Sequence, residues 1–236
     1  MRLYLTFAFV LFGVITAHAQ IFTPNDKVDN NPTFDKQRWS WGYFLGFNNY
    51  DLNFDYIKYV PSEATGKDFE VDRTIGFNVG LIGNMRINEH LDLRLEPGVA
   101  FSRINFQFYK AEPDSFREIN NTYVHIPLLL KFSTTRINNF KPFVVGGLST
   151  SINLSSNENN PDDNYNGQFR MKTNAYYYEI GFGIDLYMYY FKFTPSIRGV
   201  FGLSDEIVRD DTPNSHYTSN IDKMSTRAIF INFTFQ

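Results

Sequence analysis

The sequence predicts an all-β fold, an eight-stranded antiparallel up-and-down transmembrane β-barrel with short periplasmic turns and long extracellular loops. Two observations predict it. In eight segments, large apolar side chains alternate with small or polar ones, and a period of two places successive side chains on opposite faces of a strand. The connections between these segments alternate between long and short, which is typical of a barrel with all turns at one end and all loops at the other.

The clearest alternation lies between residues 176 and 201. Up to Leu186 the even positions are bulky and apolar, and the odd positions between them include Glu179 and Asp185. After a tight join at 188–190 the phase reverses, with Lys192 and Arg198 between apolar residues. Two alternating runs joined by so short a connection predict an antiparallel hairpin.

Six further segments show the same pattern and are predicted strands: 39–48, 75–81, 91–101, 123–132, 140–154 and 228–235. Long polar connections are expected at 50–72, 109–121, 155–173 and 204–223, and short turns at 86–90 and 133–139. The facing of the fifth strand is ambiguous around Gly146 and Gly147. Pro127 in the fourth strand predicts a bulge, because proline cannot donate a ladder hydrogen bond.

A soluble barrel with its apolar face turned inward is the alternative. The interior of eight strands is just wide enough to be filled by side chains, and four or five large apolar groups per strand are too many for it. Lipid is therefore the expected partner of the bulky face, and the bacterial outer membrane the expected location. Aromatic residues near the strand ends are the expected interfacial girdles: Trp39, Trp41, Tyr176, Tyr178, Tyr189, Phe191, Phe233 and Phe235.

The same alternation turns a set of charged and polar side chains toward the lumen. Buried charges must pair, because an unpaired charge in a narrow interior is very costly. We therefore expect a salt-bridged plug, with no open pore, that holds the barrel together. Its members are Arg94, Glu96, His125, Glu179, Asp185, Lys192 and Arg198.

The N-terminus has the three parts of a secretory signal peptide: basic Arg2, an apolar core, and the small-x-small site that ends at Ala19. Cleavage between Ala19 and Gln20 is expected. The predicted organisation is a signal peptide at 1–19, an extended periplasmic lead at 20–38 and the barrel at 39–236. A net charge of −3 argues against a nucleic-acid partner. The absence of cysteine excludes disulfides, thiol catalysis and a lipoprotein anchor.

No catalytic motif stands out, although the sequence alone leaves open that a serine and a carboxylate meet His125 on one face. We expect no enzyme activity, no cofactor, no resident metal and no small-molecule substrate. The acidic stretch 157–164 offers oxygen ligands for calcium. Its spacing matches no EF-hand, and a solvated acidic loop is the simpler interpretation.

Several segments resemble a known family. Residues 123–132 (YVHIPLLLKF) resemble a strand of small outer-membrane barrels of Bacteroidota. More specific segments are similar to the PorT family, called SprT in gliding bacteria: 153–163, 167–173, 191–199 and 219–227. The resemblance implies a non-enzymatic outer-membrane component of type IX secretion, needed for gliding motility in motile species, that contacts other secretion-machinery proteins. The alternative is a generic structural or adhesive outer-membrane barrel whose function lies in its extracellular loops.

Overall fold

The structure, a computed structural model, describes residues 29–56, 69–108, 116–158, 170–208 and 221–236. It contains a short 3-10 helix, η2 (Phe34–Lys36), and ten β-strands. Among the described residues, no helix has the length and apolar character needed to cross a membrane. The strands are β1 (Trp39–Tyr56), β2 (Phe69–Arg73), β3 (Ile75–Arg86), β4 (Leu91–Leu95), β5 (Gly98–Phe108), β6 (Phe116–Ser133), β7 (Phe140–Asn153), β8 (Asn174–Tyr187), β9 (Lys192–Gly202) and β10 (Ile221–Phe235).

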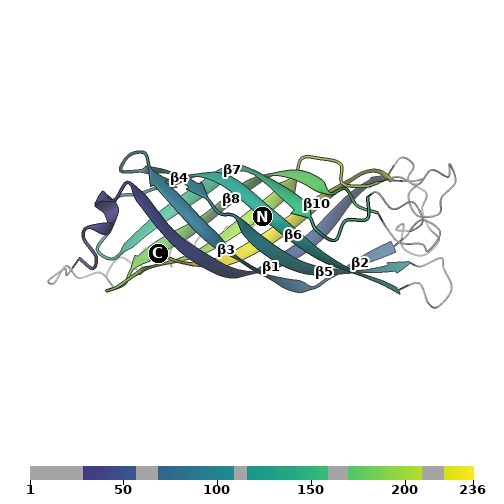
Figure 1. The fold of residues 1–236 in the computed structure, drawn as a ribbon, viewed down its shortest axis with the longest axis horizontal. Helices are drawn as coiled ribbons and strands as arrows, with labels where there is room; N and C mark the ends of the chain where they lie inside the picture. The colour runs from purple at the N-terminus through teal and green to yellow at the C-terminus, as the bar shows by residue number, and fades with distance from the viewer. Residues whose placement is uncertain (1–28, 57–68, 109–115, 159–169, 209–220) are drawn as a thin grey trace, which may run out of the picture.

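The strands form a single antiparallel sheet whose pairings close into a ring (Figure 1). Strand β1 pairs with β10 on one side and with β3 on the other. Strands β2 and β3 follow one another with a break at Thr74, and β4 and β5 with a break at Glu96 and Pro97, so the ten segments make eight barrel strands. The predicted eight-stranded up-and-down fold is confirmed.

Pro127 does not produce the expected bulge. Strand β6 keeps one register with β4 and β5, from the pair Leu95 and Leu128 to the pair Gly98 and His125. The ladder is instead interrupted on the facing strand, where Glu96 donates its backbone N–H to the Pro127 carbonyl at 3.2 Å. Two prolines, at 97 and 127, remove their donors from the same stretch, so the bonds are lost without an extra residue.

The bulky faces point outward, as the alternation predicts. Trp41 on β1 is 70% exposed and Phe182 on β8 is 60% exposed, whereas the side chains between such residues lie in the lumen. On β7 the structure resolves the ambiguous facing: Val144 and Leu148 point outward, and Phe143 and Val145 are buried inside.

The strands next to the long connections extend further than predicted. Residues 50–56 belong to β1 and residues 116–121 belong to β6, although both stretches were expected to be connections. With 18 residues, β1 spans about 60 Å, or roughly 42–48 Å of height at the usual barrel tilt of 35–45°. An outer-membrane apolar band is only about 25 Å tall, so β1 is long enough to pass beyond it.

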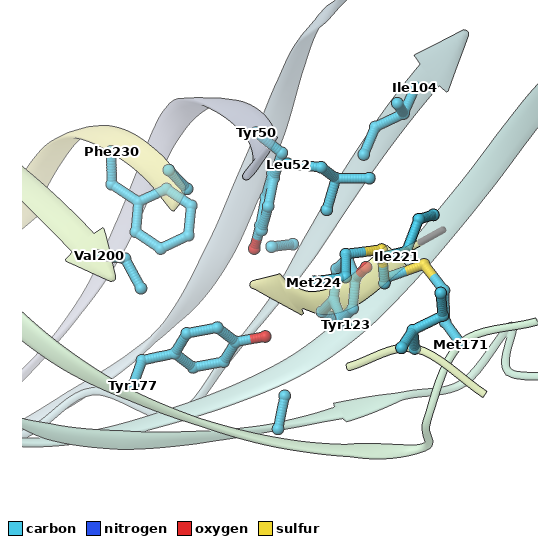
Figure 2. Packing of buried hydrophobic residues seen from close by; sticks show 14 residues of the cluster. Tyr50, Leu52, Ile104, Tyr123, Met171, Tyr177, Val200, Ile221, Met224 and Phe230 are labelled. Carbon is cyan, nitrogen blue, oxygen red and sulfur yellow. The ribbon is translucent and has the colours of Figure 1, made fainter. Parts of the chain in front are cut away.

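The polarity of the wall reverses in this extension. On β1, Asn49 and Asp51 follow Phe47 on the outer face, while Tyr50 and Leu52 are buried in the lumen. Inside, a hydrophobic cluster fills the barrel at this level (Figure 2). The cluster contains Tyr50, Leu52, Ala100, Ile104, Tyr123, Met171, Ala175, Tyr177, Val200, Ile207, Ile221, Met224, Ala228 and Phe230.

Candidate functional site

The central lumen holds an ion-pair network built from four walls of the barrel. The Glu96 carboxylate, at the junction of β4 and β5, accepts from Arg94 at 3.3 Å and from Arg198 of β9 at 2.7 Å. Arg198 Nε also lies 2.8 Å from Glu179 Oε2 of β8, an ion-pair distance without hydrogen-bond geometry. His125 of β6 completes the network, with Nε2 2.7 Å from Glu179. All five side chains are buried.

A second network lies closer to the short turns. Asp185 of β8 accepts from Lys131 of β6 and from the Thr194 hydroxyl at 2.7 Å, and Lys192 Nζ lies 3.8 Å from the same carboxylate. Lys131 was not among the residues proposed from the sequence, although its odd position on the fourth strand turns it inward. Its ammonium also lies 4.2 Å from the centre of the Phe143 ring.

The networks place the Glu96 and Asp185 carboxylates against two cationic groups each and Glu179 against Arg198, which offsets part of their desolvation. The Phe143 ring lies between them, since the Arg94 guanidinium is 5.4 Å from its centre and Lys131 is on the same ring. Cation–π contact is stronger away from water. Sequence reasoning missed Phe143 because β7 carries apolar residues on both faces.

His125 brings a serine and a carboxylate together. Its Nδ1 lies 2.6 Å from Ser151 Oγ of β7, and its Nε2 faces Glu179. Serine hydrolases use the same order of groups, in which a serine nucleophile contacts a histidine base and the histidine contacts a carboxylate. Here, however, Ser151 is 2% exposed, and Arg198 also holds the Glu179 carboxylate. The arrangement acts as a buried hydrogen-bond relay between strands.

A small cavity beside this relay has a volume of about 10 Å³, at the lower limit for one water molecule. His125, Glu96 and Arg198 line it together with the rings of Phe44 and Phe230, and Ser151 is not among its lining residues. A substrate larger than water has no room there.

Glu206, between β9 and β10, is a buried acid at the long-connection end. It accepts from Thr226 N at 2.9 Å, from Thr226 Oγ1 at 2.7 Å and from the Tyr177 hydroxyl at 3.3 Å. Burial raises the pKa of the Glu206 carboxyl above its ordinary value, although the Thr226 and Tyr177 hydrogen bonds act in the opposite direction. This carboxyl ties residues beyond β9 to the lumen face of β10.

Residues 29–38 dock on the short-turn end of the barrel, where the purple η2 helix is visible in Figure 1. We call residues 29–38 the clasp. Asp35 accepts from the Tyr187 hydroxyl at 2.6 Å and lies 3.6 Å from Arg136. The Phe34 ring lies 4.4 Å from Lys192 Nζ. The clasp therefore differs from the extended segment expected at 20–38, because an aromatic and an acidic side chain find partners on the barrel.

The clasp covers a polar recess of about 20 Å³ at the mouth of the lumen. Asp185 and Lys192 of the second network line this recess together with Phe34 and Asp35 of the clasp. Asn30 of the clasp donates two hydrogen bonds to the barrel: its backbone N–H donates to Asn139 Oδ1 at 2.9 Å, and its side-chain amide donates to the Tyr187 carbonyl at 3.0 Å.

The aromatic residues proposed as girdles gather near the two ends of the apolar wall. Trp39 and Trp41 stack on each other, and the Phe235 ring contacts those of Phe191 and Tyr43. Tyr189 is exposed in the turn after β8. Phe233 stacks on Phe193. Tyr176 and Tyr178 are exposed at the other end of β8.

Two other proposals depend on residues that the structure does not describe. Ala19 and Gln20, the expected cleavage site, lie outside the described residues, as does 159–164 of the acidic stretch. Glu158 is described, and its carboxylate accepts a hydrogen bond from Thr173 N at 2.8 Å. Hydrogen bonding from the backbone and side chain of Thr173 lowers the pKa of Glu158. In the described part of the chain, no group of three or more histidine or acidic residues is arranged to hold a metal ion.

Comparison with known proteins gives one family. The model of the outer membrane protein beta-barrel domain matches residues 19–208. Among solved structures, the chain is similar to OprG of Pseudomonas aeruginosa, with 10% identity, a TM-score of 0.49, and coverage of 83% of this chain and 94% of OprG. It is also similar to Ail of Yersinia pestis in complex with a heparin analogue, with 12% identity, a TM-score of 0.38 and coverage of 84% and 99%. A comparison with curated proteins finds no match.

Proposed function

The chain belongs to the outer membrane protein beta-barrel domain family, and on this premise we propose that it is a non-enzymatic accessory or assembly component of type IX protein secretion, required for gliding in motile species. The bacterial outer membrane is its location, and lipid surrounds its wall. Its partners would be other proteins of the secretion machinery.

The type IX assignment is supported by the sequence resemblance to the PorT family of Bacteroidota. The matching segments combine a long connection at 153–163 and 167–173 with the strand at 191–199 and the start of β10 at 219–227. The described strand residues of these segments, 192–199 and 221–227, lie on adjacent strands, because β9 and β10 pair with each other. A continuous surface of this kind suits a protein contact.

The filled lumen carries the mechanistic part of the proposal. Charge networks occupy its middle and short-turn end, and the hydrophobic cluster of Figure 2 occupies the other end. Eight strands leave no room for a folded cargo protein even without these side chains. The protein would therefore assist export through contacts made by its outer surface, its long connections or its N-terminal lead, and would not be the conduit.

A clean deletion in the source bacterium tests the proposal. Cargo that carries type IX signals should accumulate in the cells, an intact copy should restore export, and a periplasmic marker should stay inside as the leakage control. Unchanged export in the deletion strain would overturn the secretion proposal. It would leave a structural or adhesive barrel, for which removal of residues 155–170 should abolish surface binding.

A further inference from the structure

On four adjacent strands, the exposed apolar residues of the outer wall end within one pleat of the same register. The last exposed apolar residues at the long-connection end are Phe47 on β1, Ile75 on β3, Phe101 on β5 and Ile229 on β10. These strands are neighbours in the order β10, β1, β3, β5. An exposed arginine lies two residues beyond the apolar residue on β10, on β5 and on β2, which continues β3 past Thr74. We call these three the arginine row: Arg73, Arg103 and Arg227.

The arginine row is positioned by neighbours on β1. Arg73 Nε lies 3.3 Å from Asp51 Oδ1, and the Arg73 side chain is 57% exposed. Asp51 is also the register partner of Arg227, whose guanidinium donates to Asn53 Oδ1. A one-residue register shift at Thr74 separates the pairing of β2 with β5 from that of β3 with β5, and Arg73 reaches across to β1. Asp51 therefore holds the Arg73 guanidinium, and Asn53 holds that of Arg227.

The row occupies one side of the barrel. On β6 to β9, the outward residues next to the long connections whose side chains are described are uncharged: Thr122, Leu154, Asn174 and Leu203. Behind the row the lumen is packed with apolar side chains such as Tyr50, Ile104 and Ala228. The strands that carry the arginines are therefore supported from inside by a packed apolar core.

We propose that the arginine row binds the phosphate groups of a glycolipid in the outer leaflet of the outer membrane. Both described chain ends and the short turns share one end, which is periplasmic in barrels of this kind, so the row faces the cell surface. It lies one pleat, roughly 7 Å, beyond the last apolar side chain, at the level of lipid headgroups. Arginine binds phosphate with a planar, multidentate fork.

An acidic protein segment is the other anion that arginines of this kind bind. A protein site has no reason to follow the edge of the apolar band, whereas a headgroup site must. The constant offset of two residues from Ile75, Phe101 and Ile229 therefore favours the lipid.

Native mass spectrometry of the full-length protein in zwitterionic nanodiscs tests this proposal with bisphosphorylated lipid A, its dephosphorylated form and inorganic phosphate as probes. The test variant is the triple substitution R73Q/R103Q/R227Q. The matched control removes three basic side chains at the short-turn end, K36Q/R38Q/R86Q. Heat-modifiable gel migration confirms that each variant is folded.

The wild type and the control should bind the phosphorylated lipid about ten-fold or more tightly than the dephosphorylated one, since each bond to a charged group contributes about a ten-fold effect. The triple variant should lose that preference. An equal preference in the triple variant, or none in the wild type, would overturn the proposal. Binding of inorganic phosphate without selectivity for the phosphorylated lipid would also overturn the proposal. So would the finding that binding of an acidic peptide requires the arginine row while binding of the lipid does not.

Discussion

His125 Nε2 lies 2.7 Å from a carboxylate oxygen of Glu179, and this contact joins β6 to β8 across the intervening β7. Glu96 and Arg198 make a longer connection, at 2.7 Å between the β4–β5 junction and β9 on the opposite wall. The backbone ladders hold only neighbouring strands together. The lumen network therefore links walls that share no backbone hydrogen bonds, which makes it a cross-brace of the closed barrel.

Substitution of Glu96 by glutamine should weaken this brace. The variant leaves two buried guanidinium groups, those of Arg94 and Arg198, without the carboxylate that both contact. Removal of one partner of a buried ion pair costs about 3–5 kcal/mol. The free energy of unfolding in urea, measured in lipid vesicles, should fall by this amount. Glu89→Gln, an exposed residue of the turn before β4, is the control, and an equal effect of the two variants would contradict the brace.

Ser151 should not behave as a nucleophile. It has the histidine and carboxylate that a hydrolase needs, but it is buried, and the adjacent cavity of about 10 Å³ is at the lower limit for one water molecule. The folded protein should not react with a fluorophosphonate probe. Ser151→Ala should lower the free energy of unfolding by only about 1 kcal/mol, the usual contribution of one hydrogen bond. Labelling of the wild type that disappears in Ser151→Ala would instead establish an accessible nucleophile.

The clasp should loosen when its link to β8 is removed. Asp35→Asn weakens the acceptor of the Tyr187 hydroxyl and removes the charge that faces Arg136. Amide hydrogen exchange of residues 29–38 should become faster, while that of the barrel strands stays the same, because the clasp lies outside the strands of the sheet. Asp29→Asn, an exposed neighbour of equal charge, is the matched variant. If Asp29→Asn accelerates exchange equally, the specific contact is not what holds the clasp.

The buried carboxyl of Glu206 should make local stability at the long-connection end depend on pH. Burial raises the pKa of its carboxyl in the folded state above the ordinary 4.5, so the folded state holds the proton more tightly than the unfolded state does. Stability from this group is complete below the ordinary pKa and is lost as the pH rises through the higher folded pKa. The hydrogen-exchange protection factor around Thr226, which removes the intrinsic pH dependence of amide exchange, should therefore fall over that window, and Glu206→Gln should abolish this fall.

Glu158 provides a control, because local stability around it should change with pH in the opposite direction. Hydrogen bonds from Thr173 lower the pKa of Glu158 below its ordinary value. Its contribution is present above the ordinary pKa and is lost as the pH falls through the lower folded pKa. The protection factor at Thr173 should thus fall toward acid, and a pH dependence of the same sign at both sites would contradict the assignment for Glu206.

Sequence alone could predict the architecture because a period of two is a local property. The same period turns Glu179, Asp185 and Arg198 inward, but it cannot say which partner each of them meets. Phe143 was missed because β7 is apolar on both faces, so its alternation carries no signal. The clasp was missed for another reason: the contact between Asp35 and Tyr187 joins residues 152 positions apart, and nothing in either neighbourhood indicates the other.

The strand ends were missed because their polarity is reversed. Residues 49–56 alternate as regularly as 39–47, but the apolar side chains Tyr50, Leu52 and Phe54 occupy even positions, which face the lumen. If apolar residues are expected only on the outer face, this stretch is predicted to be a polar connection. Beyond the apolar band the barrel follows the rule of soluble barrels, with an apolar inside and a polar outside.

This reversal predicts where the membrane ends on β1. The chain has no cysteine, so single-cysteine variants report without background. In vesicles, Asn53→Cys and Asp55→Cys should react with a membrane-impermeant maleimide, because their outward positions lie beyond the apolar band. Leu45→Cys and Phe47→Cys should not react, and a nitroxide at either position should contact lipid-soluble oxygen. Leu52→Cys, which faces the packed lumen, should be protected from both reagents. Rapid maleimide labelling at Phe47 would place the boundary lower on the wall, and it would then also separate the arginine row from the headgroup level.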